Sequence, residues 1–279
     1  MLRKGSAMTS TPQNEPGNGE FRTGNVLGVK VAAVQREFAT NAICDRASER
    51  AGGYVCAAPV HSIMEGFDGP DFRTILNRAW MVVPDGLPVA VALRLQGFKG
   101  QPRVPGPDLM LLVCEEAARR GLQVGFYGSS DECLGLLREK LPQRAPGLKI
   151  AYTYSPPHRP LSAEEDAAVV REITESGVDL LFIGLGCPKQ ERWMHEHLDR
   201  ISAVQLGVGA AFDFHAGLLK RAPEWMQKSG LEWFYRLVME PKRLWWRYLK
   251  HNPRFVINVL LQRFGLKKFN TDPVGAPSH

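Results

Sequence analysis

Short apolar, β-branched segments alternate with longer helical patterns along most of this chain, and this alternation constrains the fold more than any other feature. Strands that alternate with helices form a parallel sheet with helices on both faces. We therefore predict an α/β fold with a Rossmann-like parallel sheet flanked by helices. The expected strands are Val29–Val34, Tyr54–Ala58, Met81–Val83, Gln123–Tyr127, Lys149–Tyr154, Asp179–Ile183 and Ala203–Gly207. The expected helices are Thr40–Ala51, Asp71–Asn77, Val89–Gln96, Pro107–Arg120, Asp131–Leu141, Ala163–Ser176 and Pro188–His195.

The alternation stops near residue 222, and this change divides the chain. Residues 1–24 and 270–279 are rich in small and polar residues, so we expect two disordered tails. Residues 25–221 form the expected α/β core. Residues 222–269 carry Trp, Tyr and Phe among basic residues without strand patterns, which predicts a C-terminal helical appendage that associates with a membrane. Within the core, Ser162 followed by Glu165 predicts a capping box at a helix start.

The positive charge is concentrated in the appendage. The whole chain has a formal net charge of +6. Residues 220–269 hold twelve Lys and Arg against three acids, a net charge of +9, whereas the remaining residues hold 23 basic and 26 acidic side chains, a net charge of −3. A basic segment on a slightly acidic body predicts an anionic partner such as a lipid surface, a diphosphate or a nucleic acid.

Cysteine usage and hydropathy indicate the compartment. Five scattered cysteines form no Cys-x-x-Cys pair, which argues against a zinc site or disulfide framework and is typical of a reducing compartment. The first 24 residues contain no apolar secretory segment, and no stretch reaches the roughly 18 apolar residues of a spanning helix. We expect a cytoplasmic protein that lies peripherally on the inner face of the cytoplasmic membrane.

The first candidate site residue is Asp85, in the segment Val82-Val83-Pro84-Asp85-Gly86. Ligands of open α/β sheets bind outside the carboxyl ends of the strands, where this carboxylate is expected. It can act as a general base toward a hydroxyl group. The alternative is an Asp-Gly turn in which the carboxylate caps the next helix.

The second candidate is the segment from Gly184 to Glu191. Gly184 and Gly186 follow a buried-type strand and precede a helix start, which offers backbone N–H groups to a phosphate. Lys189 adds charge, and Gln190 can hydrogen-bond a sugar or uracil. The segment lacks the Gly-x-Gly-x-x-Gly pattern of dinucleotide sites, and a plain strand-to-helix turn explains it equally well.

Other candidates are weaker. Arg103 precedes a rigid turn and can bind a diphosphate through two hydrogen bonds, or form a surface ion pair. Gly209 lies among small residues after a strand, which can admit a ligand or a close helix contact. His195 and His197 are two residues apart and face away from each other on a helix, so this pair predicts no metal site.

Several segments together resemble one known family. They appear in the family's order and cover about residues 28–255: Pro84-Asp85-Gly86, Arg103-Val104-Pro105-Gly106-Pro107-Asp108-Leu109, Phe126-Tyr127-Gly128, Gly184 to Glu191, Gly207 to Asp213, Ala222-Pro223, Gly230 to Trp233, Arg236-Leu237, Glu240 to Arg243 and Arg247-Tyr248-Leu249. On these residues the chain resembles the WecG/TagA/CpsF glycosyltransferases, glycosyltransferase family 26.

The resemblance implies a function and roles for residues. It implies inverting transfer from a UDP-sugar to a polyprenyl-diphosphate-linked sugar in the biosynthesis of bacterial surface polysaccharides or exopolysaccharides. Asp85 matches the catalytic base, and Arg103 and Gln190 match substrate-binding residues. Arg236, Arg243 and Arg247 match basic positions of an appendage thought to close over the active site, where they would neutralise a diphosphate. No cofactor or metal is implied, and the chain has no Asp-x-Asp motif.

One segment departs from the family pattern. The family usually has Thr-x-Asn after the second strand, where this chain has Ala57 and Pro59, which offer no side-chain hydrogen bonds. His61 could replace them as a substrate contact. The departure leaves the sugar open: N-acetylmannosamine is the best-known donor sugar of the family, and a glucose- or glucuronate-type donor is equally compatible with this chain.

Two other functions compete with the transferase. A soluble nucleotide-dependent oxidoreductase is disfavoured by the absent Gly-x-Gly-x-x-Gly pattern. A non-catalytic basic adaptor for lipid or nucleic acid would use the α/β body as a scaffold. The transferase hypothesis expects no nucleic-acid partner, and it leaves a homo-oligomer open because exposed aromatic residues can form a subunit interface as well as a membrane contact.

Overall fold

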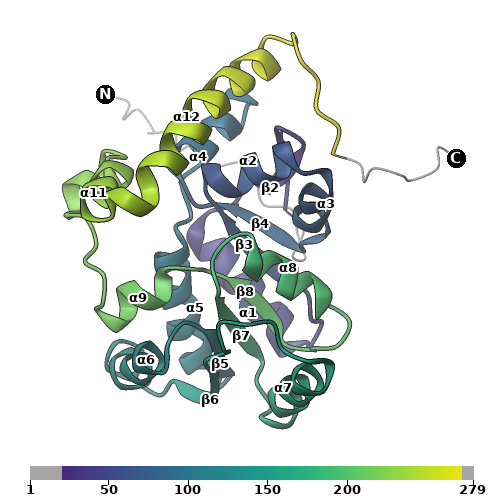
Figure 1. The fold of residues 1–279 in the computed structure, drawn as a ribbon, viewed down its shortest axis with the longest axis vertical. Coiled ribbons are helices and arrows are strands. Elements are labelled where there is room, and N and C mark those ends of the chain that lie inside the picture. The colour runs from purple at the N-terminus through teal and green to yellow at the C-terminus, as the bar shows by residue number, and fades with distance from the viewer. Residues whose placement is uncertain (1–20, 272–279) are drawn as a thin grey trace, which may run out of the picture.

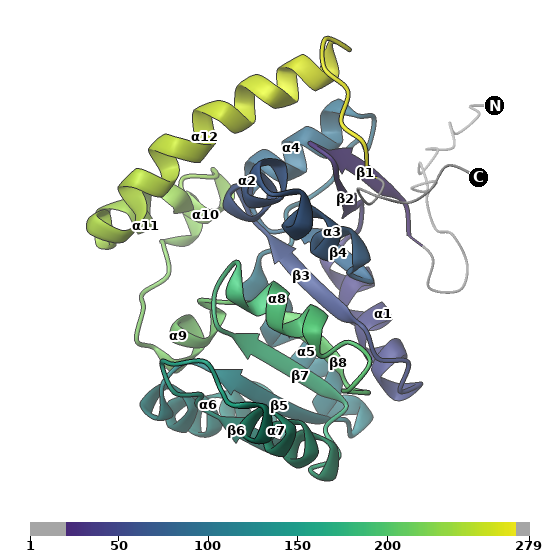
Figure 2. The ribbon, with the colours of Figure 1, turned by 45° about the vertical axis from the view of Figure 1, so that its right-hand side comes forward.

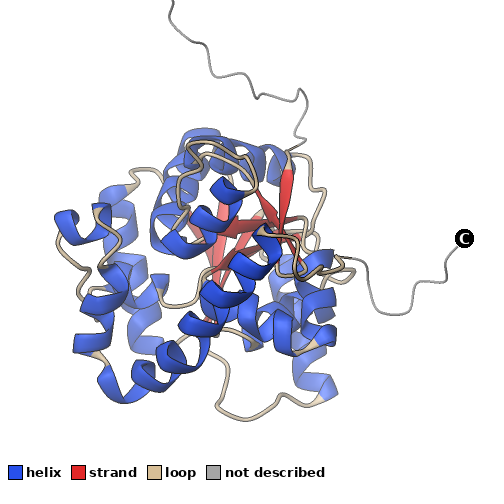
Figure 3. Cartoon of the chain, turned by 90° about the horizontal axis from the view of Figure 1, so that it is seen from above, coloured by secondary structure: helices blue, strands red, loops and turns tan. Residues whose placement is uncertain are grey.

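A six-stranded parallel sheet lies at the centre of the molecule. The computed structural model describes residues 21–271, without the side chains of Lys228 and Arg243. The strand order is β4-β3-β8-β7-β5-β6, and every neighbouring pair is parallel. Helices surround the sheet on both sides (Figure 3), as predicted. The strands are β3 (Tyr54–Ala58), β4 (Met81–Pro84), β5 (Gln123–Gly128), β6 (Lys149–Tyr154), β7 (Leu180–Gly184) and β8 (Val204–Gly207).

Two hydrophobic clusters bury the two faces of the sheet. The helices of the first cluster are α1 (Arg36–Ser48), α5 (Gly106–Arg120), α6 (Asp131–Arg144) and α9 (Ala211–Ala216). The helices of the second cluster are α2 (Val60–Asp68), α3 (Pro70–Arg78), α4 (Leu87–Leu95), α7 (Ala163–Glu175) and α8 (Lys189–Glu196), joined by part of α12 (Pro241–Arg263). The strands β3, β4, β7 and β8 are almost wholly buried, which is typical of a sheet covered on both faces.

The first strand segment lies outside this sheet, contrary to the prediction for Val29–Val34. It forms β2 (Val29–Ala32), which pairs antiparallel with β1 (Thr23–Val26) in a separate hairpin. Leu27 and Gly28 join the two strands with φ of 53° and 93°, the positive values that a tight hairpin turn requires. Of the tail predicted for residues 1–24, residues 1–20 lie outside the described residues. The predicted boundary is wrong at its end, because Thr23 and Gly24 belong to β1. Residues 272–279 are also outside the described part of the chain.

Helix ends follow local chemistry. The capping box predicted at Ser162 and Glu165 is present at the start of α7. Ser130 caps α6 by accepting a hydrogen bond from Cys133 N. We predicted no helix at α2 or α9, although both follow strands of the sheet and lie at the candidate site. α9 has only six residues, too few to show a helical period. α2 does show one, with Val60, Ile63, Met64 and Phe67 on one face, and the prediction missed it.

The C-terminal segment is helical, as predicted, and its last helix packs on the body. It contains α10 (Glu224–Lys228), α11 (Glu232–Met239) and α12. Figure 1 shows α12 running above α2 and α4, and Figure 2 shows α10 and α11 at one end of it. Phe255 and Val259 of α12 are buried in the second cluster, and Arg254 forms two hydrogen bonds with Asp68 of α2. Among the described helices, none is both long and apolar enough to cross a bilayer.

Candidate active site

Two cavities meet at the carboxyl end of the sheet. The first, here called the polar cavity, has a volume of about 340 Å³ and lies over the ends of β3, β4, β7 and β8. The second, here called the apolar cavity, has a volume of about 360 Å³ and lies between the body and α11 and α12. Both volumes lie within the usual range for small-molecule sites. The residues that line both cavities are Pro59, His61, Asp85, Pro107, Phe214, Arg236 and Arg247.

Asp85 lies at the junction of the two cavities. It follows β4 directly, and its Oδ1 accepts a hydrogen bond from Gly106 N at 3.0 Å. Burial raises the pKa of this carboxyl above its ordinary value, and Glu232 adds to the rise, whereas Gly106 N–H and the guanidinium groups of Arg236 and Arg103 oppose it. A carboxylate that is partly desolvated and has a raised pKa is a stronger proton acceptor than an exposed one. Asp85 does not cap α4, the helix that follows it, but Gly106 is the first residue of α5, so the carboxylate does satisfy a backbone N–H at the start of that helix.

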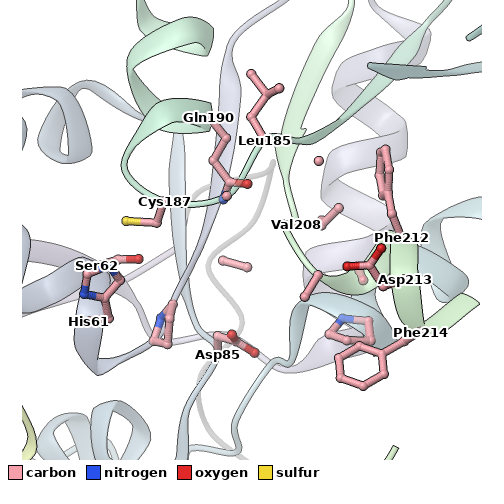
Figure 4. A pocket seen from close by; sticks show the side chains of 18 of the residues that line it. His61, Ser62, Asp85, Leu185, Cys187, Gln190, Val208, Phe212, Asp213 and Phe214 are labelled. Carbon is pink, nitrogen blue, oxygen red and sulfur yellow. The ribbon is translucent and has the colours of Figure 1, made fainter. Parts of the chain in front are cut away.

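The loop after β7 forms the wall of the polar cavity opposite Asp85. In Figure 4, Gln190 lies across the cavity from Asp85. Gly184 and Gly186 line the same wall. Glycine is required at 184, since a Cβ there would lie 2.6 Å from the ring of Phe212. The loop therefore brings backbone close to any ligand in the cavity.

Gln190 and the carboxyl group behind it are both buried. Gln190 Nε2 donates a hydrogen bond to Glu191 Oε1 at 3.1 Å, and Gln190 Oε1 has no partner. The Glu191 side chain is fully buried, and burial raises its pKa to about 7 against weaker opposing hydrogen bonds, including one from Gln190. Gln190 is thus held at the cavity wall with a free acceptor.

The segment after β8 supplies a further wall. Gly209, predicted as a site residue, lines the polar cavity together with Phe212 and Asp213. Asp213 comes from α9 and lies to one side of the cavity in Figure 4. Asp213 ends the segment Gly207 to Asp213 that carries the family resemblance, but the sequence assigns it no role. Its position after a strand is the same signal that identified Asp85.

Arg103 contacts the appendage. Its Nη1 donates to Glu232 Oε2 of α11 at 2.5 Å, and its Nη2 donates to the carbonyl oxygen of Gln227 at 3.0 Å. Both side chains are largely buried and line the apolar cavity. Arg103 therefore forms an ion pair, as one of the two interpretations of the sequence expected. The pair is not a surface pair, because it is largely buried and joins the body to the appendage. Sequence reasoning did not find Glu232, whose partner is 129 residues away.

Two arginines of the appendage face both cavities. Arg236 of α11 lies with its guanidinium 5.6 Å from the centre of the Phe214 ring and 3.9 Å from Glu240. Arg247 of α12 lines the same junction. The side chain of Arg243, the third predicted arginine, lies outside the described part of the structure. The appendage thus brings at least two cations next to Asp85.

His61 and the two small residues before it form the remaining wall. His61, at the start of α2, lines both cavities, and Ala57 and Pro59 line the polar one. Burial, with Arg247 and His251 nearby, lowers the pKa of His61 to about 4. Lys189, in contrast, is exposed and does not line either cavity. His195 and His197 contact Tyr54 and Asp166 respectively, away from these cavities.

Known proteins of one family match this chain. The model of the "Glycosyl transferase WecG/TagA/CpsF family" matches residues 24–269. The chain is 30% identical over 204 residues to a Bacillus subtilis protein named N-acetylglucosaminyldiphosphoundecaprenol N-acetyl-beta-D-mannosaminyltransferase, covering 73% of this chain and 77% of the relative. Proteins of the same name from Bacillus spizizenii and Staphylococcus aureus strain MW2 are 31% and 32% identical, covering 75% and 71% of this chain and 79% and 75% of theirs.

Proposed function

This chain belongs to the WecG/TagA/CpsF family of glycosyltransferases, and from this premise we propose that it moves a sugar, with inversion, from a UDP-sugar to a polyprenyl-diphosphate-linked sugar. The names of its relatives specify an acceptor sugar linked to undecaprenol through a diphosphate. One observation carries the proposal for this chain. Asp85 lines both cavities, so a single carboxylate can contact a donor in one and an acceptor in the other.

The two cavities suit the two substrates. The polar cavity is lined by backbone of the Gly184–Gly186 segment and by Gln190, groups that hydrogen-bond a diphosphate and a sugar. The apolar cavity contains Leu87, Trp233, Leu244 and Phe255, which suit the first part of a polyprenyl chain. Arg236 and Arg247 lie between the two cavities, where diphosphate groups of either substrate would meet them.

The reaction follows from this placement. The Asp85 carboxylate removes the proton of the acceptor hydroxyl, and the hydroxyl oxygen attacks the anomeric carbon of the donor sugar from the face opposite to the diphosphate. The bond between that carbon and the phosphate oxygen breaks, and UDP leaves with the electron pair. Attack from the opposite face inverts the anomeric carbon. Arginines beside the departing diphosphate stabilise its developing charge.

The identity of the donor sugar has to be established separately from that of the donor nucleotide. Ala57 and Pro59 line the polar cavity and present no side-chain hydrogen-bonding group there. The sugar must therefore be recognised by other groups, of which Gln190, Asp213 and His61 lie in the same cavity. N-acetylmannosamine and glucose- or glucuronate-type sugars are all to be tested as donors.

The position at the membrane follows from the acceptor. A polyprenyl acceptor is held in the bilayer, so we propose that the protein lies peripherally on the inner face of the cytoplasmic membrane. The appendage supports this proposal with exposed aromatic side chains on α11 and α12, including Trp233, Trp245 and Trp246. Such rings next to basic residues lie in the headgroup region without spanning.

A transfer assay tests the proposed function. The full chain is incubated with each of several UDP-sugars and a short polyprenyl-diphosphate-linked sugar, and products are read by mass. We expect one added sugar with one donor. Asp85→Asn preserves shape and the acceptor for Gly106 N–H but removes the base, so the rate should fall by about 10²–10⁴-fold.

Asp71→Asn is the matched control, since Asp71 is exposed on α3 and outside both cavities. It should retain the wild-type rate. Transfer by Asp85→Asn at the wild-type rate would exclude Asp85 as the base. No product with any donor, by folded protein that binds vesicles, would favour the adaptor function.

A further inference from the structure

Three side chains with metal-binding atoms converge between the body and the appendage. His61 and Glu65 lie one turn apart on α2, and His251 lies in the middle of α12. His61 Nδ1 is 3.7 Å from Glu65 Oε1, and His251 Nε2 is 3.8 Å from the same oxygen. One ligand atom of each side chain lies within 4.8 Å of the other two. His251 is far from the other two in sequence and meets them only because α12 packs on α2.

The protein alone does not satisfy these groups. Distances of 3.7 and 3.8 Å are too long for hydrogen bonds. His61 Nδ1, the ring atom that faces Glu65, is shielded from solvent and has no hydrogen-bond partner. The ring atom of His251 that faces Glu65 is Nε2. The side chains of the two histidines are only 15% and 4% exposed, so water does not readily replace a partner. A buried polar atom without a partner calls for an explanation, and a bound ion supplies one here.

We propose that His61, Glu65 and His251 bind one divalent transition-metal ion of the zinc class. Two imidazoles and a carboxylate form a usual donor set for zinc. Magnesium and calcium prefer oxygen ligands, so two histidines argue against either ion. Zinc bonds of roughly 2.0–2.2 Å place tetrahedral ligand atoms about 3.4 Å apart, so small side-chain rotations would close the observed spacing. Three protein ligands leave the fourth position for water.

The charges around the three ligands are of both signs. Arg254, one turn after His251, is neutralised by its two hydrogen bonds with Asp68. Arg247, one turn before His251, and Lys250 both lie near His61 and oppose a cation there. Glu65 supplies one negative charge to the ion directly.

The role that follows is structural. The ion would join α2 to α12 one helical turn from Arg247, and so hold the appendage over the cavities. The transfer step proposed above uses no metal. The site therefore does not depend on the proposed function, and its test uses metal binding rather than activity.

The full chain is stripped with a chelator and titrated with Co²⁺, whose visible absorption reports a tetrahedral site, and then with Zn²⁺ in competition. We expect one equivalent per chain and a higher unfolding temperature with Zn²⁺ present. Loss of an outer partner of a metal site alone costs about 10–100-fold in affinity, so loss of a ligand in His251→Ala or Glu65→Gln should weaken Zn²⁺ binding by about 100-fold or more.

His158→Ala is the matched control, because His158 is exposed and outside the cluster. It should bind like the wild type. If His251→Ala fails to fold, Glu65→Gln decides, because Glu65 is one third exposed and glutamine keeps its shape. Absence of stoichiometric binding by the wild type, or equal binding by Glu65→Gln, would overturn the proposal.

Discussion

At the residue scale, Glu191 is a carboxyl that folding removes from water directly behind the polar cavity. It is fully buried, and its pKa rises to about 7 from an ordinary value of 4.5, mainly because burial disfavours the charged form. The folded state therefore binds a proton more tightly than the unfolded state. The resulting stability is fully present below about pH 4.5 and is lost as the pH rises to about 7.

This shift predicts how Glu191→Gln changes stability. The variant cannot ionise, so it avoids the loss that the wild type suffers between pH 5 and pH 8. Over that range the variant should gain on the order of 3 kcal/mol relative to the wild type. Urea unfolding at both pH values measures the difference. Glu196→Gln, at an exposed position of the same helix, should show no such change. A parallel pH dependence for Glu191→Gln and the wild type would contradict the burial argument.

Candidate site residues were predictable where they lie at the carboxyl end of a predicted strand. Asp85 and Gly209 come after buried strands and Gly184 ends one, and the structure places all three around one cavity, as the topology of parallel sheets requires. Glu232 was not predictable in the same way, because its partner Arg103 becomes a neighbour only through the packing of α11. His251 was missed for the same reason, since sequence spacing does not show which face of α12 meets α2.

At the element scale, α11 and the start of α12 expose large aromatic side chains. Trp245 and Trp246 are 52% and 59% exposed, and Trp233 and Phe234 of α11 are 44% and 48% exposed. The opposite face of α12 is buried through Leu244, Phe255 and Val259. An amphipathic helix whose outer face carries Trp fits the interface of a bilayer.

The double substitution Trp245→Ser/Trp246→Ser tests this surface. Removing two exposed rings costs the protein little stability but removes their burial in lipid, so affinity for anionic vesicles should fall by about 10-fold or more. Co-sedimentation of the full chain with anionic vesicles measures this affinity. Leu218→Ser is the control and should bind as the wild type does, since Leu218 is 44% exposed and lies two residues after the end of α9. Unchanged binding by the double variant would mean that this face does not contact the bilayer.

The elements themselves were mostly predictable from periodicity. Six of the seven expected strands enter the parallel sheet, and their ends differ by one residue at most. The exception is β2, whose apolar pattern does not reveal that a tight turn at Leu27-Gly28 pairs it with β1. The six-residue α9 was missed because it holds too few turns to show a period. Length does not explain why α2 was missed, since α3 and α4 have the same nine residues and were predicted.

At the scale of the whole molecule, folding places the Lys and Arg side chains of the basic segment in three kinds of surroundings: the cavities, ion pairs with the body, and the exposed surface. Arg236 and Arg247 line the cavities, whereas Arg221 and Arg254 form ion pairs with Asp108 and Asp68 of the body. The exposed remainder includes Lys242, Lys250, Arg263, Lys267 and Lys268. The net charge of +9 therefore overstates what an anionic membrane meets.

Lys242 and Lys250 flank Trp246 at a spacing of one turn on either side. Each exposed cation near an anionic surface contributes about 1 kcal/mol, so Lys242→Gln/Lys250→Gln should weaken binding to anionic vesicles by roughly 10- to 30-fold at low salt. Salt screens the same charges, so the difference between variant and wild type should shrink as ionic strength rises, and it should be absent with uncharged vesicles. Lys30→Gln/Lys149→Gln, at exposed positions of the body, removes the same total charge and should bind nearly as the wild type does. Equal losses in the two double variants would show that net charge, and not the orientation set by α12, brings the protein to the membrane.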